Sequence, residues 1–160
     1  MAIRSGAKAL VYHNGKILLN QCRFSSGEIY YDLPGGGQNP YETLEEAVVR
    51  EVAEETGYIV SVRRFIGIAE QIFDDVKLRE QYPDYAHRVL HIFLVDIVGE
   101  TKEKPTELDF QQEASVWLTP EEADRVNVSP PQLSGRLAAL VKEGVQPEYF
   151  GAVRMQDTAI

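Results

Sequence analysis

The chain has 160 residues, of which 44% are hydrophobic and 26% are charged, as is typical of a globular protein with a substantial core. Lys and Arg number 16 against 25 Asp and Glu, and this net charge of −9 argues against binding to a nucleic-acid polymer or to an anionic membrane. The single Cys22 cannot form an internal disulfide, and the sequence contains neither a signal peptide nor an apolar run of about 20 residues, so we expect a cytoplasmic protein.

The first part of the chain predicts a hairpin followed by an irregular loop. Two strand-like runs, residues 7–13 and 16–24, flank Asn14-Gly15, which is a strong hairpin signal. The stretch YYDLPGGG, residues 30–37, is expected to lack regular structure, because Pro34 and three glycines disfavour it.

A helical pattern then runs from about Thr43 to Thr56. Thr43 and Glu46 have the spacing of an N-terminal capping box, and Gly57 suits the position just past a helix end.

Strand-like segments dominate the rest of the chain. Residues 58–73 predict one long strand, or two strands broken near Gly67, and residues 88–98 give the clearest strand pattern. The other expected elements are loops over 74–86 and 101–112, a strand over 114–118, and helices over 120–126 and 132–144. Strands precede and follow the main helix, so we expect a single mixed α/β (α+β) domain over residues 1–160, with a core over about 5–143 and a tail over 145–160.

The main helix gathers acidic residues on one side. Glu51 and Glu55 are like charges at positions i and i+4, which costs about 0.2–0.5 kcal/mol. Glu54 and Glu55 also lie at the negative end of the helix dipole, where a cation would gain about 0.3–1 kcal/mol. Carboxylates at this spacing suit Mg²⁺ or Mn²⁺, but a solvated acidic face explains the helix equally well.

Three glycines, Gly35, Gly36 and Gly37, lie just before this helix. Glycines let backbone groups approach a ligand closely, and a glycine-rich loop entering a helix can bind phosphate. Taken alone, the three glycines fit a simple turn better.

The spacing between these glycines and the acids resembles the Nudix box. That pattern is Gly, five residues, Glu, seven residues, Arg-Glu, a bulky apolar residue, any residue, Glu-Glu, any residue, Gly and a bulky apolar residue. Every fixed polar and glycine position matches over 23 residues, from Gly36 through Glu42 and Arg50 to Tyr58, where Tyr58 replaces the usual aliphatic residue. The resemblance extends over roughly residues 5–143.

The resemblance implies a mixed β-sheet sandwiched between α-helices and hydrolysis of a diphosphate linkage. The expected substrate is a small molecule, either a nucleoside diphosphate joined to another group or a nucleoside triphosphate, and the expected cofactor is Mg²⁺, with Mn²⁺ as the alternative. The expected metal ligands are Glu51, Glu54, Glu55 and the backbone oxygen of Gly36, with Glu51 as general base in the alternative assignment. Arg50 and Glu42 are expected to orient the acids through a salt bridge. The resemblance also implies a possible homodimer, because family members often form one, but the sequence itself does not predict the oligomeric state.

Outside the box the sequence offers weaker candidates. A general base on a later loop could be Glu107, Asp109 or Glu113, although solvated loop acids are the simpler interpretation.

Phe73, Tyr82 and Tyr85 could stack on a base, although anchoring their loop to the domain is the simpler interpretation for each. Phe73 and Asp74 occupy the positions where some subfamilies carry substrate markers, and neither marker is present. The substrate therefore stays open, as does a broad-specificity enzyme. The alternative to an enzyme is a catalytically silent nucleotide-binding sensor or regulatory module with the same fold.

Overall fold

The computed structural model describes residues 2–101 and 112–156, and within them nine strands form one mixed sheet. The strands are β1 (Arg4–His13), β2 (Lys16–Arg23), β3 (Ile29–Asp32), β4 (Gly35–Gly37), β5 (Tyr58–Phe73), β6 (His87–Glu100), β7 (Gln112–Leu118), β8 (Val128–Ser129) and β9 (Glu148–Met155). Their order is β8-β3-β2-β1-β6-β5-β9, with β4 paired to β1 and β7 paired to β2. The β1–β6, β3–β8 and β5–β9 pairs are parallel and the other pairs are antiparallel.

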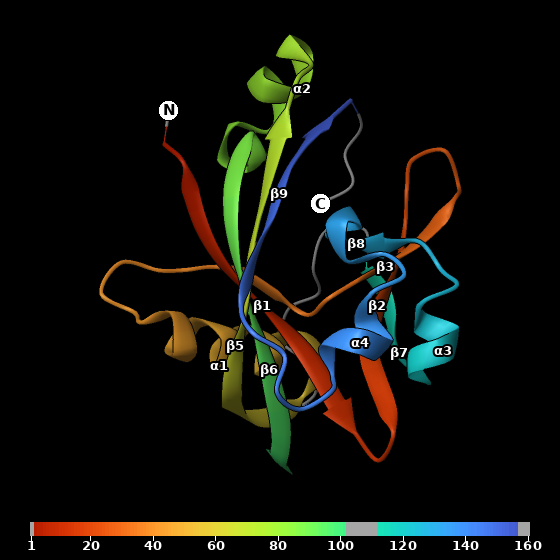
Figure 1. Ribbon diagram of the computed structural model, residues 1–160. Coiled ribbons are helices and arrows are strands. Elements are labelled where there is room, and N and C mark those ends of the chain that lie inside the picture. The colour runs from red at the N-terminus through yellow and green to blue at the C-terminus, as the bar shows by residue number, and fades with distance from the viewer. Residues whose placement is uncertain (1, 102–111, 157–160) are drawn as a thin grey trace.

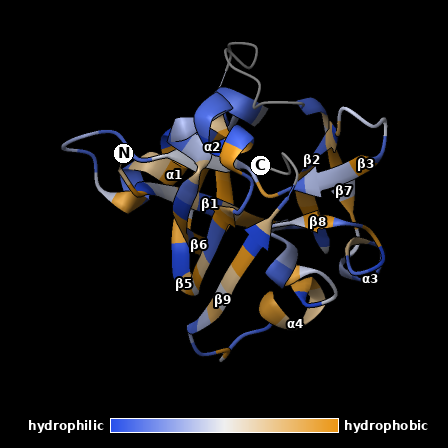
Figure 2. Ribbon diagram, turned by 90° about the horizontal axis from the view of Figure 1, so that it is seen from above, coloured by the Kyte–Doolittle hydropathy of each residue, from blue (hydrophilic) through white to orange (hydrophobic). Residues whose placement is uncertain are grey.

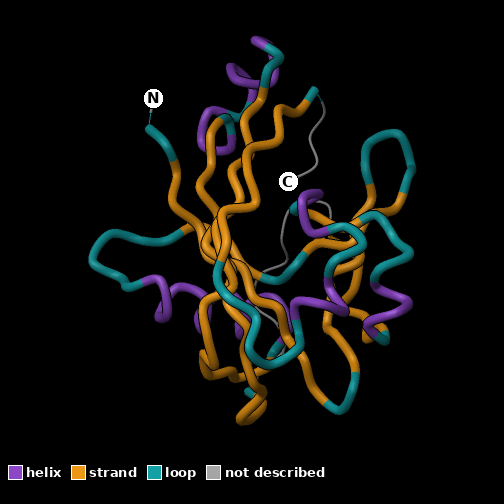
Figure 3. Tube along the Cα trace, viewed as in Figure 1, coloured by secondary structure: helices purple, strands orange, loops and turns teal. Residues whose placement is uncertain are grey.

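Helices cover the sheet on both sides, which confirms the expected sandwich (Figures 1 and 3). The helical elements are α1 (Leu44–Thr56), α2 (Val76–Gln81), η1 (Pro83–Tyr85), α3 (Pro120–Ala123), η2 (Pro131–Leu133) and α4 (Leu137–Leu140). One buried cluster joins α1 to β1 and β6 through Val48, Val52 and Phe93. A second cluster joins α3, η2 and α4 to the opposite face of the sheet. The sheet therefore holds α1 in place independently of the other helices.

Several predicted elements are confirmed. The hairpin turns at Asn14 and Gly15, both at positive φ, and the main helix begins after its cap Thr43 and ends at Gly57. Residues 58–73 form one strand, β5, whose pairing with β6 shifts register next to Gly67.

The expectation of an irregular YYDLPGGG segment is wrong, because its two ends form β3 and β4. Gly35, at φ 145°, lies so close to β1 that a Cβ on it would be 2.1 Å from the carbonyl oxygen of Ala7. The missing side chains are therefore what allow β4 to pair with β1.

Two further expectations need correction. The segment 74–86, expected to be a loop, contains α2 and η1. Helix α2 has no buried residue and is mostly hydrophilic in Figure 2, so no apolar periodicity in the sequence predicts it. Asp75 starts α2 by accepting hydrogen bonds from the amides of Lys77 and Leu78. The single helix expected over 132–144 is broken into η2 and α4, because Gly135 at φ 75° interrupts it.

Residues expected to form a tail contribute strand β9, which pairs in parallel with β5. Its end, Met155, is buried against Phe73 and Ala86. The helix expected over 120–126 is shorter and ends at Ala123, and most of the loop expected over 101–112 lies outside the described residues. None of the helices in the described ranges is long and apolar enough to cross a membrane.

Candidate active site

Helix α1 presents the acids of the box from a fixed position. Thr43 accepts a hydrogen bond of 3.1 Å from the amide of Glu46, and the Gly57 amide donates to the carbonyl of Ala53 at 2.9 Å. Both ends of the helix are thus capped, and its apolar side is buried in the sheet. The direction of each acidic side chain follows from this anchoring.

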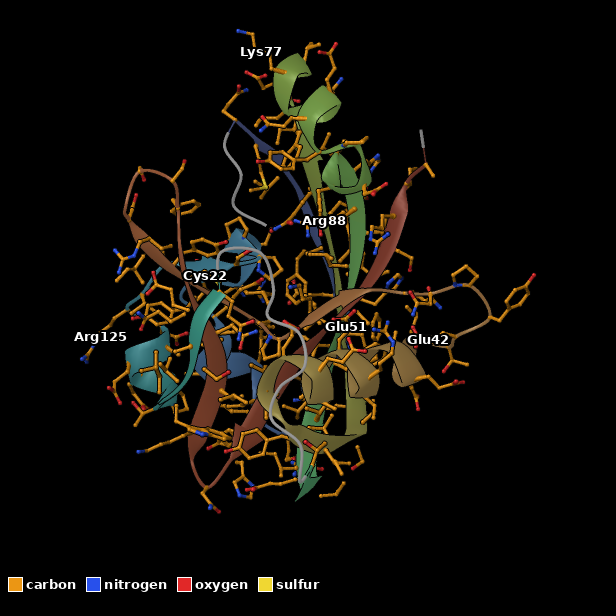
Figure 4. All side chains as sticks on the ribbon, turned by 180° about the vertical axis from the view of Figure 1, so that it is seen from behind. Cys22, Glu42, Glu51, Lys77, Arg88 and Arg125 are labelled. Atoms are coloured by element: carbon orange, nitrogen blue, oxygen red, sulfur yellow. The ribbon has the colours of Figure 1, made fainter. Side chains whose placement is uncertain are left out.

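Arg50 joins the glycine strand to the acids (Figure 4 labels Glu42 and Glu51). Its guanidinium binds Glu42 with two hydrogen bonds, of 2.7 and 2.9 Å, and donates to the carbonyl of Gly37 at 2.9 Å. Its Nη1 also contacts Glu51 at 2.9 Å and Glu54 at 3.2 Å. Arg50 lowers the pKa of Glu42, and Glu42 in turn raises the pKa of Arg50, so both groups are charged.

Glu55 is buried, with 2% of its surface exposed, and it holds β4 against the helix. Its two oxygens accept hydrogen bonds from the amide of Gly35, at 2.9 Å, and from the side chain of Asn20, at 3.1 Å. Asn20 is also bound by Ser115 at 3.1 Å. The sequence patterns do not predict these partners; the signal available was a polar Asn20 inside the apolar run of β2.

The Glu51 carboxyl lies directly against the backbone of Gly36. A Cβ on Gly36 would be 2.7 Å from the carboxyl carbon of Glu51, so a larger residue here would push the Glu51 carboxyl out of its position. Burial raises the pKa of Glu51, and the neighbouring Arg50 opposes that shift.

Carboxylate oxygens such as those of Glu51 and Glu54 are the ligands that a hard divalent cation prefers. In this structure Nη1 of Arg50 contacts both carboxylates, at 2.9 and 3.2 Å, so a bound cation would share them with Arg50. Among the described residues, however, no three His, Cys, Asp or Glu side chains converge into a metal-binding cluster. Glu55 is turned toward Gly35 and Asn20, as described above. A metal bound here would therefore be held first by Glu51 and Glu54.

A cavity of about 110 Å³ opens beside Glu51. Its lining residues come from β1, β4, α1, η1 and β6: Arg4, Gly6, Lys8, Gly35, Gly36, Gly37, Glu51, Tyr85, Arg88 and Leu90. Lys8 is buried and binds Asp32 at 3.0 Å, and Arg88 binds Gln71. The sequence patterns do not single out the basic residues of this cavity, although Arg4, Gly6 and Lys8 alternate as one face of a strand requires.

The aromatic candidates divide between the core and the cavity. Phe73 has no exposed surface and packs with Ala86 and Met155, which does not agree with stacking on a substrate. Tyr82 packs against that same cluster. Tyr85 both packs there and lines the cavity, where the Arg88 guanidinium lies 5.4 Å from its ring centre.

Of the candidates for a distant general base, only Glu113 lies within the described residues. Glu113 is exposed on β7 and forms an ion pair with Arg23 at 2.5 Å, which lowers its pKa and makes it a weaker base. Glu107 and Asp109 lie outside the described residues.

Comparison with known proteins agrees with this arrangement. A model of the NUDIX domain matches residues 3–138. An ADP-ribose pyrophosphatase of Methanocaldococcus jannaschii is 32% identical over 90 residues, or 56% of this chain and 48% of the relative, so this chain spans about half of that relative's length. A nucleoside triphosphatase NudI of an Enterobacter species is 26% identical over 125 residues, or 75% of this chain and 84% of the relative.

Solved structures share the fold. A Nudix hydrolase from Nitrosomonas europaea has a TM-score of 0.68 at 19% identity and covers 91% of this chain and 93% of its own. An ADP-ribose pyrophosphatase from Streptococcus suis has a TM-score of 0.60 at 19% identity, with 92% and 99% covered. The domain match over most of the chain and the box at residues 36–58 lead to one conclusion: the chain belongs to the Nudix hydrolase family.

Proposed function

We propose that the protein hydrolyses a diphosphate linkage in a small nucleotide-type substrate, using Mg²⁺ or Mn²⁺ held by the acids of α1. The observation that carries this proposal is the Arg50 network. One guanidinium binds the carbonyl of Gly37, Glu42, Glu51 and Glu54 at 2.7–3.2 Å, and so fixes the glycine strand relative to the acids. Acids that are already in place need little reorganisation when charge develops on a substrate phosphate.

The three acids of α1 have different roles. Glu51 and Glu54 lie beside the glycine strand, with 17% and 28% of their side chains exposed, and are the proposed metal ligands, while Glu55 fixes the position of Gly35 through its hydrogen bond of 2.9 Å. When bound, the divalent cation neutralises phosphate charge and makes a bound water more acidic. In the alternative assignment Glu51 is not a metal ligand but the general base, and the burial that raises its pKa suits that role.

The test is a hydrolysis assay with Mg²⁺ on nucleoside triphosphates, ADP-ribose, nucleotide sugars and dinucleoside polyphosphates. The panel includes both substrate types that appear in the names of the two relatives above. Glu54→Gln should reduce turnover by about 100-fold or more, whereas Glu80→Gln, which removes an exposed carboxylate from α2, should leave it unchanged. Turnover of no member by the folded wild-type protein would refute the enzyme, and nucleotide binding without turnover would identify the sensor instead.

A further inference from the structure

An amide side chain lies in the buried centre of β2, among the apolar residues of that strand. Asn20 has no exposed surface, and it follows Leu18 and Leu19 along the chain. Alternation places Asn20 on the same face as Leu18, which packs against α1. Burying an amide costs free energy unless its donor and its acceptor are hydrogen-bonded, and Leu would fill a similar volume without that cost. The amide is therefore explained by its hydrogen bonds and not by its packing.

Ser115 determines which end of this amide faces the helix. Strand β7 lies beside β2 (Figure 1), and Ser115 is the direct cross-strand partner of Asn20. The Ser115 hydroxyl donates to Oδ1 of Asn20 at 3.1 Å, and Nδ2 of Asn20 donates to Oε1 of Glu55 at 3.1 Å. If the amide were turned round, its oxygen would lie against the Glu55 carboxylate, and two acceptors cannot bond each other. The bonds from Ser115 through Asn20 to Glu55 thus favour a single orientation of the amide.

The Glu55 carboxylate connects this chain of hydrogen bonds to the glycine strand β4. Its Oε2 accepts a hydrogen bond of 2.9 Å from the amide of Gly35, at the start of β4. Arg50 donates to the carbonyl of Gly37, at the end of β4, also at 2.9 Å. Helix α1 therefore holds both ends of a three-residue strand, and the position of Gly36 between them depends on both contacts.

We propose that Asn20 is a positioning residue of the proposed metal site and acts through Glu55. The inference rests on the proposed function, in which Glu51 and Glu54 hold the cation. The Glu51 carboxyl lies against Gly36, where a Cβ would be 2.7 Å from its carboxyl carbon, so a shift of β4 changes the space that Glu51 occupies. Without the amide of Asn20, Glu55 loses a buried donor and holds β4 less firmly. Groups that orient metal-binding side chains from behind contribute about 10- to 100-fold to metal affinity or activity.

The binding test titrates Mn²⁺ into the substrate-free protein and follows the titration by calorimetry. Asn20→Leu keeps the volume of the side chain and removes the amide, so we expect the Kd for Mn²⁺ to rise roughly 10- to 100-fold. The matched control is Asn127→Leu. Asn127 is exposed and also donates to a glutamate, Glu28, at 3.1 Å, but it lies next to β8 at one end of the strand order. Asn127→Leu should bind Mn²⁺ with the affinity of the wild type.

A second variant, Ser115→Ala, keeps the test decisive if Asn20→Leu does not fold. Ser115 is exposed, so removing its hydroxyl leaves the core intact while it releases the acceptor end of the Asn20 amide. We expect a Tm close to that of the wild type and a Kd for Mn²⁺ that rises roughly 2- to 10-fold, which corresponds to one hydrogen bond. A purely structural network would lower the Tm and leave the Kd unchanged.

The outcomes of the Mn²⁺ titration are decisive. A wild-type Kd in folded Asn20→Leu refutes the proposal. If that variant does not fold, a wild-type Kd in Ser115→Ala refutes it, and so does the absence of Mn²⁺ binding by the wild-type protein.

Turnover distinguishes this inference from the proposed function. On a substrate that the wild type hydrolyses, Asn20→Leu should lower kcat about 10- to 100-fold and change KM by less than about 3-fold, because Asn20 acts on the metal site and not on substrate binding. A loss confined to KM, or unchanged kinetics, would refute the positioning role and leave the hydrolase intact. Weaker Mn²⁺ binding by Asn20→Leu, in a protein whose wild type turns over no substrate, would support the positioning role and refute the hydrolase.

Discussion

Replacing Glu42 with Gln tests whether Arg50 owes its position to a charged partner. The pair is joined by hydrogen bonds of 2.7 and 2.9 Å, and the exposed fractions of the two side chains are 14% for Glu42 and 26% for Arg50. Breaking an exposed pair costs about 0.2–1 kcal/mol and breaking a buried one about 3–5 kcal/mol, so this half-buried pair lies between them. Gln keeps an acceptor for Arg50, so we expect Glu42→Gln to lower the free energy of unfolding by about 1–2 kcal/mol.

The assay is urea and thermal unfolding of Glu42→Gln and of the control Glu80→Gln at several pH values. A loss of about 1–2 kcal/mol corresponds to a fall in Tm of about 2–8 °C for a chain of this size. Because Arg50 holds the pKa of Glu42 below its ordinary value of 4.5, the stability from this ionised group is present above pH 4.5 and is lost as the pH falls through the folded pKa. The difference between wild type and Glu42→Gln should shrink in the same direction. A difference no larger than that of the control, or one that grows in acid, contradicts the reasoning.

Four further substitutions separate structural from chemical roles. Glu54→Gln should change the free energy of unfolding by less than about 0.5 kcal/mol, whereas Glu55→Gln should lower it by about 1–3 kcal/mol, because it weakens two buried hydrogen bonds. Urea unfolding measures both values. Similar values for the two variants would contradict a structural role for Glu55 and a chemical role for Glu54. Burial raises the pKa of Glu51, so its ionisation opposes folding as the pH rises above 4.5. Glu51→Gln should therefore raise the Tm of the metal-free protein at pH 7 to 8 and leave it unchanged at pH 4. A Tm below that of the wild type at pH 7 would refute this reasoning. Gly35→Ala should destabilise the fold by more than about 3 kcal/mol, since the new Cβ would lie 2.1 Å from a carbonyl oxygen of β1, and a soluble variant of unchanged Tm would show that β4 can move.

The sequence predicts the parts of the site that depend on local signals. The capped helix, the hairpin and the spacing between Gly36 and Glu42 are all visible in the printed residues, and so is the match to the box. Contacts across the sheet are not visible in this way. The bond from Asn20 to Glu55 joins residues 35 positions apart, and Arg4 meets Arg88 only because β1 and β6 pair in parallel. Such contacts depend on strand order, which the pattern of a single strand does not contain.

Elements without an apolar face were also missed. Helix α2 buries no residue, so its only sequence signal was the cap Asp75. Strand β9 alternates weakly, because it lies at one end of the strand order and most of its side chains are exposed or half-buried. Helix α2 is defined by its own hydrogen bonds and its cap, and β9 by its pairing with β5, so hydrophobic periodicity predicts neither element.

The parallel pairing of β9 with β5 has a consequence for the order of folding during synthesis. The box lies within the first 60 residues, and its contacts with β1 and β2 can form as soon as β5 and β6 have left the ribosome. The cluster of Phe73, Ala86 and Met155, against which Tyr85 packs, is completed later. It needs Met155 of β9, whose carbonyl accepts a hydrogen bond from the amide of Asp74. A ribosome stalled before β9 should therefore carry a folded box with β1 and β6 in place, while the packing beside Tyr85 is still incomplete.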